Sequence, residues 1–231
     1  MSRLALVLLP GLLCDARLWR DQAADLADIA ETRIADLTRD DTITAMAERV
    51  LDAAPPRFAL AALSMGGYVA FEIMRRAPER VSRLALFDTS AAADGPEQTA
   101  RRKAALRSMK LGRFAGVTDR FLPQLIHESR VHGPVGAEVK AMAARVGADA
   151  FRRQQQAIIA RPDSLPGLGA IRVPSLVAVG DGDRVTPLAQ AEAIQRAIPG
   201  SRLHVFAACG HLPPLELPAE TSALLRDFLS P

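Results

Sequence analysis

The sequence contains few of the residues on which several common classes of protein depend. Of its 231 residues only two are cysteines, and it has a single tryptophan and a single tyrosine. Two cysteines, Cys14 and Cys209, are too few for a disulfide framework, and no group of residues has metal-ligand spacing. Aromatic residues make up only 4% of the chain, and no basic stretch alternates with them to stack nucleic-acid bases. We therefore expect no metal site and no nucleic-acid partner.

Long apolar runs are also missing, since no uninterrupted run approaches the length that a membrane-spanning helix requires. The first run follows one arginine and ends at Cys14, which is a pattern that a secretory or lipoprotein signal also shows. However, Leu13 precedes Cys14 where processing requires a small residue, and Pro10 and Gly11 interrupt the run. We therefore expect this segment to be a buried strand of a cytoplasmic protein without a membrane partner.

The composition is typical of a globular domain. Hydrophobic residues make up 49% and charged residues 24%, and the formal net charge is +3. A chain of 231 residues is long enough for one sizeable α/β domain with an insertion, and short for two independent domains.

Apolar runs of strand length alternate with segments of helical periodicity. The predicted strands are residues 4–9, 32–37, 58–63, 83–88, 174–180 and 201–209. The helices predicted around them are residues 18–27, 42–54, 65–77, 188–198 and 218–229. This alternation predicts the α/β class, with a mostly parallel six-stranded sheet and helices on both faces.

Residues 91–165 form an exception, because they have helical patterns and no strand. The predicted helices are residues 98–109, 113–125, 135–146 and 148–160, of which part of the last could belong to the sheet layer. We expect this segment to be a helical lid inserted into a core made of residues 1–90 and 166–231. A lid would lie over the end of the sheet where α/β proteins place their sites.

Ser64 lies where the strand predicted at residues 58–63 meets the following helix. A serine hydroxyl is a weak nucleophile, and a sharp turn at this point exposes it beside helix-start N–H groups. Such a turn needs small residues nearby, and the chain supplies Ala62, Gly66 and Gly67. The same pattern also fits a serine that caps the helix or a turn that binds phosphate.

Two later strands are followed by the other residues that a nucleophilic serine requires. Asp183 follows the strand at 174–180, and His211 follows the strand at 201–209. The order serine, acid, histidine predicts that His211 accepts the Ser64 proton while Asp183 orients the imidazole ring. Asp88 is a rival for the acid, because it ends the strand after Ser64.

The chain resembles the α/β-hydrolase superfamily over nearly its whole length, in particular serine esterases with a helical lid. The matching motifs are ALSMGG around Ser64, a DxxTP loop at Asp183, Thr186 and Pro187, and a GHxPxxExP pattern at Gly210, His211, Pro213, Glu216 and Pro218. Ala62 stands where the family usually has glycine. Glu216 either caps a helix or fixes the His211 loop.

The resemblance also implies an oxyanion hole made by two backbone N–H groups. These are the N–H of Met65, directly after the nucleophile, and that of Leu12, in the loop after the first strand. The family usually carries His-Gly in that loop, whereas this chain has Pro10 and Gly11.

From these residues we expect a serine hydrolase that cleaves small-molecule carboxylic esters through an acyl-enzyme, without a metal or organic cofactor. The apolar residues of the predicted lid favour an apolar acyl or alcohol group. The same triad also serves thioesterases, lactonases, polyester depolymerases and enzymes that cleave carbon–carbon bonds. A non-catalytic ligand-binding protein with this fold is an alternative of another class.

Overall fold

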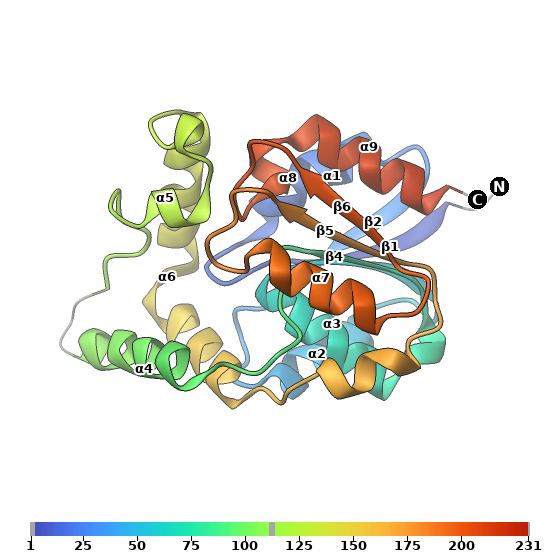
Figure 1. Cartoon of the computed structure of the whole chain (residues 1–231), viewed down its shortest axis with the longest axis horizontal. Coiled ribbons are helices and arrows are strands. Elements are labelled where there is room, and N and C mark those ends of the chain that lie inside the picture. Colours follow the sequence, from blue (N-terminus) through green and yellow to red (C-terminus); the bar gives the residue numbers. More distant parts are fainter. Residues whose placement is uncertain (1–2, 111–113, 231) are drawn as a thin grey trace.

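The computed structural model describes residues 3–110 and 114–230 (Figure 1). Its strands are β1 (Leu4–Leu9), β2 (Ala30–Ile34), β3 (Phe58–Leu63), β4 (Val81–Phe87), β5 (Ser175–Gly180) and β6 (Arg202–Phe206). Its α-helices are α1 (Arg20–Asp25), α2 (Ile43–Ala53), α3 (Met65–Arg76), α4 (Pro96–Lys110), α5 (Leu122–Leu125), α6 (Pro134–Ala160), α7 (Leu188–Ala197), α8 (Pro213–Glu216) and α9 (Pro218–Leu229). Short 3₁₀ helices are η1 (Ala16–Trp19), η2 (Pro78–Arg80), η3 (Glu128–Arg130) and η4 (Leu165–Ala170).

The strands form one sheet in the order β2-β1-β3-β4-β5-β6, and every neighbouring pair is parallel. The predicted α/β class and six-stranded parallel sheet are therefore confirmed. The strand order reverses between β1 and β3. At this topological switch point, the loops that follow the two strands diverge. Ligands of open α/β sheets bind at such a switch point.

Helices cover both faces of the sheet, and this explains why the central strands are apolar along their whole length. Helices α2, α3 and α7 pack on one face, and α1 and α9 pack on the other (Figure 1). Every residue of β3 and β5 is buried between these two layers.

Helices α4 and α5 and the first part of α6 lie apart from the two helical layers, beyond the carboxyl ends of the strands (Figure 1). The long helix α6 is interrupted at Gly147, whose φ of 77° and ψ of 177° are not helical. The two helices predicted at 135–146 and 148–160 are therefore correct, with glycine at the joint between them. The end of α6 packs on the core through Ala157 and Ile158. This agrees with the expectation that part of the helix predicted at 148–160 could belong to the sheet layer.

The helix predicted at residues 113–125 is wrong for the part that the structure describes, and residue 113 lies outside it. Residues 114–121 form no helix, and only the four residues of α5 are helical. Pro123 is the physical reason, because proline lacks an N–H and its ring clashes with the carbonyl four residues earlier. It is tolerated only in the first turn, where α5 places it.

Two predicted strands end clearly earlier than expected. The strand predicted at 32–37 begins and ends earlier, at Ala30–Ile34, because Asp36 accepts hydrogen bonds from the N–H and hydroxyl of Thr38 and turns the chain. The strand predicted at 201–209 ends at Phe206, because Ala208 has a φ of 50° and donates its N–H to Asp181.

Candidate active site

Ser64 stands at a sharp turn between β3 and α3. Its φ of 55° and ψ of −115° lie in a region that residues other than glycine rarely adopt, at a cost of about 1–3 kcal/mol. Two hydrogen bonds to the strand end next to it hold this conformation. The Ser64 N–H donates to the carbonyl of Phe87 at 3.0 Å, and the Thr89 hydroxyl donates to the Ser64 carbonyl at 2.8 Å.

Gly66 lets the start of α3 approach the loop after β1. A Cβ atom at this position would lie 2.5 Å from the Leu9 carbonyl oxygen and 2.8 Å from that of Pro10. A Cβ atom at Gly67 would overlap the side chain of Thr89. Gly66 and Gly67 are therefore needed for the close packing around the Ser64 turn.

The structure brings Ser64, His211 and Asp183 together in one hydrogen-bonded chain. The distance from His211 Nε2 to Ser64 Oγ is 2.8 Å, and that from His211 Nδ1 to Asp183 Oδ2 is also 2.8 Å. His211 is only 3% exposed and Ser64 9%. The Ser64 side chain does not cap α3, so the alternative interpretation as a helix cap is wrong.

Asp183 is surrounded by donors from its own loop. Its Oδ1 accepts the N–H groups of Val185 and Thr186 at 2.7 and 3.0 Å, and its Oδ2 accepts the Thr186 hydroxyl at 2.7 Å. Burial alone raises the pKa of Asp183, but the charge of His211 and the hydrogen bonds from His211 and Thr186 outweigh it. The pKa is therefore lowered, and Asp183 is an anion at neutral pH.

Asp88, the rival acid, lies in the same cluster without a hydrogen bond to the imidazole. Polar atoms of Asp88, Asp183 and His211 all lie within 4.8 Å of one another. Asp88 Oδ1 accepts the Gly180 N–H at 2.9 Å, and Oδ2 is buried without a partner among the described residues. Asp88, Asp183 and His211 are residue types that can bind a metal ion. However, Nδ1 of the His211 imidazole is already hydrogen-bonded to Asp183.

The two expected oxyanion donors lie on either side of the switch point. Met65 N is the first amide of α3, and Leu12 N belongs to the loop after β1. Within residues 3–110 and 114–230, neither N–H donates to a protein acceptor. Both groups therefore remain available to a substrate oxygen.

Gln154 of α6 fixes the loop that carries Leu12, and no pattern in the sequence indicated this role. The next residue, Leu13, has a φ of 59° and donates its N–H to Gln154 Oε1 at 3.1 Å. Gln154 Nε2 donates in turn to the Leu37 carbonyl at 3.1 Å. Gln154 is completely buried, but it lies among two other glutamines in a polar stretch, and only the tertiary contacts distinguish it.

Glu216 fixes the loop of His211, which was one of its two expected roles. Its carboxylate accepts the N–H groups of Gly210 and Leu212 at 3.0 and 3.2 Å. It also accepts the N–H of His127, between α5 and η3, at 2.7 Å. One carboxylate therefore joins the histidine loop to residues 91–165, the helical segment between β4 and β5 that is called the insertion below.

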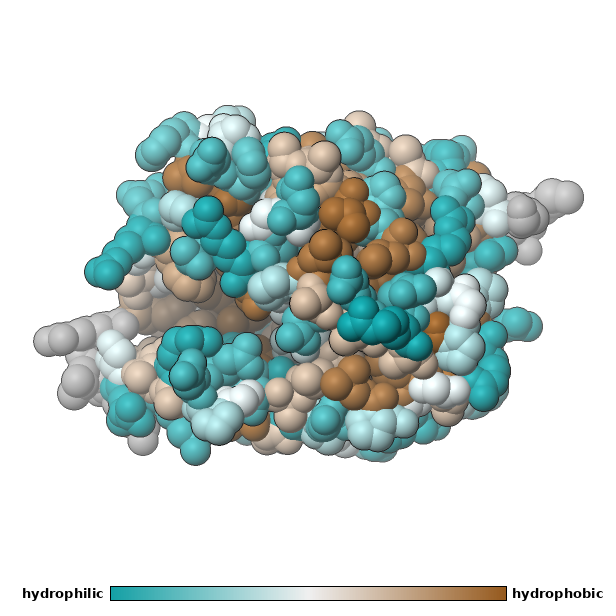
Figure 2. Space-filling view, in the orientation of Figure 1, coloured by the Kyte–Doolittle hydropathy of each residue, from teal (hydrophilic) through white to brown (hydrophobic). Residues whose placement is uncertain are grey.

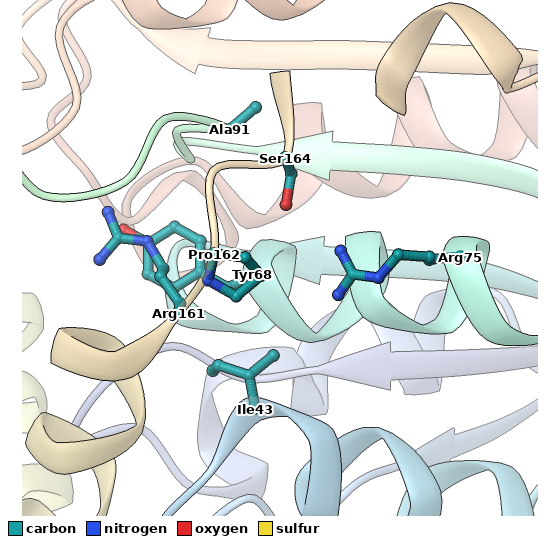
Figure 3. Close-up of a pocket in the computed structure, with 7 residues that line it drawn as sticks. All are labelled: Ile43, Tyr68, Arg75, Ala91, Arg161, Pro162 and Ser164. Carbon is teal, nitrogen blue, oxygen red and sulfur yellow. The ribbon is translucent and has the colours of Figure 1, made fainter. Parts of the chain in front are cut away.

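A second attachment joins the two ends of the insertion to α3. Arg161, just after α6, lies over the ring of Tyr68 in α3, with its guanidinium carbon 4.1 Å from the ring centre (Figure 3). The same side chain pairs with Asp94 at 2.8 Å, and Asp94 also binds Arg102 of α4 at 2.6 Å.

The side chains between the insertion and the core are mainly apolar. Figure 2 shows a hollow with an apolar lining on the side where α4 and α6 lie. The buried residues that the insertion contributes to the core cluster around Leu13 and Leu212 are Val117, Leu122, Ile126, Val139, Met142 and Ala143.

Cys14 and Cys209 are free and buried. Burial raises the pKa of Cys14 to about 12 and also raises that of Cys209, so both thiols are protonated at neutral pH. Across the described ranges, no helix combines the length and apolarity required to traverse a bilayer.

The chain is similar to known hydrolases over most of its length. It is 27% identical over 213 residues to a pimeloyl-[acyl-carrier protein] methyl ester esterase of Aromatoleum aromaticum, covering 83% of this chain and 81% of that protein. An enzyme of the same name from Neisseria meningitidis is 31% identical over 179 residues, with coverage of 72% and 67%.

Solved structures of hydrolases also resemble this chain. A thermophilic esterase from Thermogutta terrifontis is 30% identical and superposes with a TM-score of 0.87 over 99% of this chain and 90% of that one. The enol-lactonase from Burkholderia xenovorans has the same TM-score of 0.87 at 24% identity, covering 99% and 92%, which shows the shared fold alone. A model of the alpha/beta hydrolase family matches residues 6–224. The chain therefore belongs to the alpha/beta hydrolase family, among its carboxylesterase-like members.

Proposed function

We propose that this protein hydrolyses carboxylic esters through an acyl-enzyme, with Ser64 as nucleophile, His211 as general base and acid, and Asp183 as the ionised partner of His211. The observation that carries the proposal is the hydrogen-bonded chain from Asp183 through His211 to Ser64, with 2.8 Å at each step. Reactions of this kind begin from a nucleophile and a base within hydrogen-bond distance, with a third group orienting the base.

In the first half-reaction, Ser64 Oγ bonds the carbonyl carbon of the ester while His211 Nε2 takes the hydroxyl proton. The carbonyl π pair moves to oxygen and forms the tetrahedral oxyanion. When the oxyanion collapses, the bond to the alcohol oxygen breaks and His211 delivers the proton to that oxygen. Water then attacks the acyl-Ser64 ester with the same base, which releases the acid and restores the serine.

The N–H groups of Met65 and Leu12 are the proposed donors to the oxyanion. Removing one such donor from a comparable site costs about 3 kcal/mol of transition-state stabilisation. Two contacts hold these donors in place. Gly66 permits the close approach of α3 to the loop after β1, and Gln154 binds the amide next to Leu12. Every step uses groups of this chain, so the mechanism requires no cofactor.

We also propose that residues 91–165 form a lid over a core of residues 1–90 and 166–231. The attachments through Glu216 and Arg161 support this, because each one holds part of the insertion next to an element that carries a proposed catalytic residue. The apolar side chains that the insertion buries against the core favour an apolar acyl or alcohol group.

A second, narrower candidate is a methyl ester of a carrier-linked acyl chain. It is favoured by the names of the relatives from Aromatoleum aromaticum and Neisseria meningitidis. Ser64 is only 9% exposed, which favours an ester of a small alcohol such as methanol.

A panel of esters tests both candidates. We expect turnover of p-nitrophenyl esters with a preference for one acyl length, and loss of turnover in Ser64→Ala and His211→Ala. Adding the methyl and ethyl esters of the preferred acid, the matching thioester and a lactone to the panel identifies the bond that is cleaved. Faster turnover of the methyl ester than of the ethyl ester supports the second candidate.

The panel also separates an enzyme from a ligand-binding protein with this fold. A binding protein would be protected against thermal unfolding by the preferred acid but would release no p-nitrophenol above the rate of Ser64→Ala. Full ester hydrolysis by folded His211→Ala would reject the assigned base.

A further inference from the structure

The carboxyl group of Asp88 has too few partners for a buried anion. Its Oδ1 accepts one backbone N–H, that of Gly180, and its Oδ2 is inaccessible to solvent and has no donor among the described residues. Asp88 is only 1% exposed. A buried ionised carboxylate without several donors or a cation carries a large desolvation cost, so such groups usually take up a proton.

The neighbouring Asp183 has the opposite environment. Four donors point at its two oxygens, namely the N–H groups of Val185 and Thr186, the Thr186 hydroxyl and the imidazole of His211. Asp183 is therefore the anion of the pair. Two carboxyls this close together do not both ionise in a buried site, because like charges repel strongly there.

The other titratable groups around Asp88 give its Oδ2 no donor within the described residues. Asp183 faces it from the loop after β5, His211 and the protonated Cys209 from the loop after β6, and Glu216 from α8. Burial raises the pKa of Asp88 well above its usual value, and the negative charges of Asp183 and Glu216 raise it further, while the hydrogen bond from the Gly180 N–H lowers it.

We propose that Asp88 is a neutral carboxylic acid in the resting protein, whose Oδ2–H donates a hydrogen bond to the Asp183 carboxylate and holds it against His211. Asp88 is then a positioning residue for the triad acid. Its importance for catalysis rests on the proposed function, whereas its protonation state does not.

A proton on Asp88 in the folded protein predicts how stability depends on pH. In the unfolded chain Asp88 has an ordinary pKa near 4 and is ionised above about pH 5. Folding then requires the uptake of one proton, so the unfolding equilibrium constant rises with pH. The side-chain amide introduced by Asp88→Asn keeps an acceptor for Gly180 and a donor for Asp183 but takes up no proton.

Urea unfolding of the wild type and Asp88→Asn between pH 5 and 8 measures this difference. We expect the ratio of the unfolding constants, wild type over variant, to rise about tenfold per pH unit. The matched control is Asp181→Asn, because Asp181 is exposed and its pKa is lowered despite the effect of burial, through hydrogen bonds from Cys209 and Ala208. For this control the ratio should stay constant. A constant ratio for Asp88→Asn would overturn the proposal.

Steady-state kinetics test separately whether Asp88 positions Asp183. Asp88→Ala removes both the donor and the acceptor, and we expect its kcat to fall with little change in KM. The conservative Asp88→Asn should restore kcat to near the wild-type value. Equal kcat for the two variants, with both folded, would overturn the positioning role. If no ester is turned over at all, the proposed function fails while the unfolding data still report on the Asp88 proton.

Discussion

The loops that follow β4 and β5 place two aspartates beside one imidazole in different environments. Asp88 and Asp183 both follow neighbouring parallel strands, both are buried, and both have polar atoms within 4.8 Å of His211. Asp183 receives four donors and Asp88 receives one backbone donor. The number of donors, rather than proximity to the ring, therefore decides which carboxyl is the anion.

This difference arises from the residues that follow each aspartate. After Asp183 the chain folds back, so that the amides two and three residues later and the Thr186 hydroxyl point at its carboxylate. After Asp88, whose φ is 44°, the next side chain instead donates to Ser64. The loop after β4 supports Ser64, and the loop after β5 supports Asp183.

The largest expected effect is the difference in kcat between the two asparagine variants. Asp183→Asn removes the charge that stabilises the imidazolium and fixes the ring tautomer, so we expect kcat to fall about 10⁴-fold. Asp88→Asn keeps a neutral donor and should leave kcat close to that of the wild type. Steady-state kinetics with one p-nitrophenyl ester compare the two directly, and the reverse order of losses would assign the acid to Asp88.

A smaller effect should follow from removing one donor of Asp183. Thr186→Val deletes the hydroxyl that Asp183 Oδ2 accepts at 2.7 Å, so the variant should lose about 1.5–3 kcal/mol of stability at pH 7. Because the folded pKa of Asp183 is lowered, this contribution is present above the ordinary aspartate pKa and is lost as pH falls through the lowered folded value. Urea unfolding at pH 7 and pH 3 should show the loss shrinking in acid.

An exposed pair of the same type provides the control for that measurement. The Thr38 hydroxyl donates to Asp36 at 2.6 Å in an exposed turn, and hydrogen bonds to solvent can replace it. Thr38→Val should therefore cost less stability at pH 7 than Thr186→Val. Equal losses would mean that burial does not strengthen the support of Asp183.

The sequence was sufficient to predict the residues at the strand ends. In a parallel sheet the carboxyl ends of neighbouring strands meet at one edge, so Ser64, Asp183 and His211 could be brought together from strand positions and motif order alone. The same reasoning placed Asp88 nearby but could not rank its donors, because these depend on how each loop folds back.

Contacts between the insertion and the core could not be predicted. Gln154 and the His127 amide meet their partners across more than 80 residues of chain, and no periodicity encodes such pairs. The wrong helix at 113–125 has a related cause. An apolar pattern suggested a helix, while Pro123 restricts helical structure to the four residues of α5.

Labelling with a fluorophosphonate, followed by intact-mass and peptide mass spectrometry, tests most directly whether His211 makes the Ser64 hydroxyl reactive. The proposed mechanism predicts one adduct per chain, located on Ser64, with no adduct in Ser64→Ala and much slower labelling in His211→Ala. Absence of labelling in the folded wild type, or an equal adduct in Ser64→Ala, would contradict it.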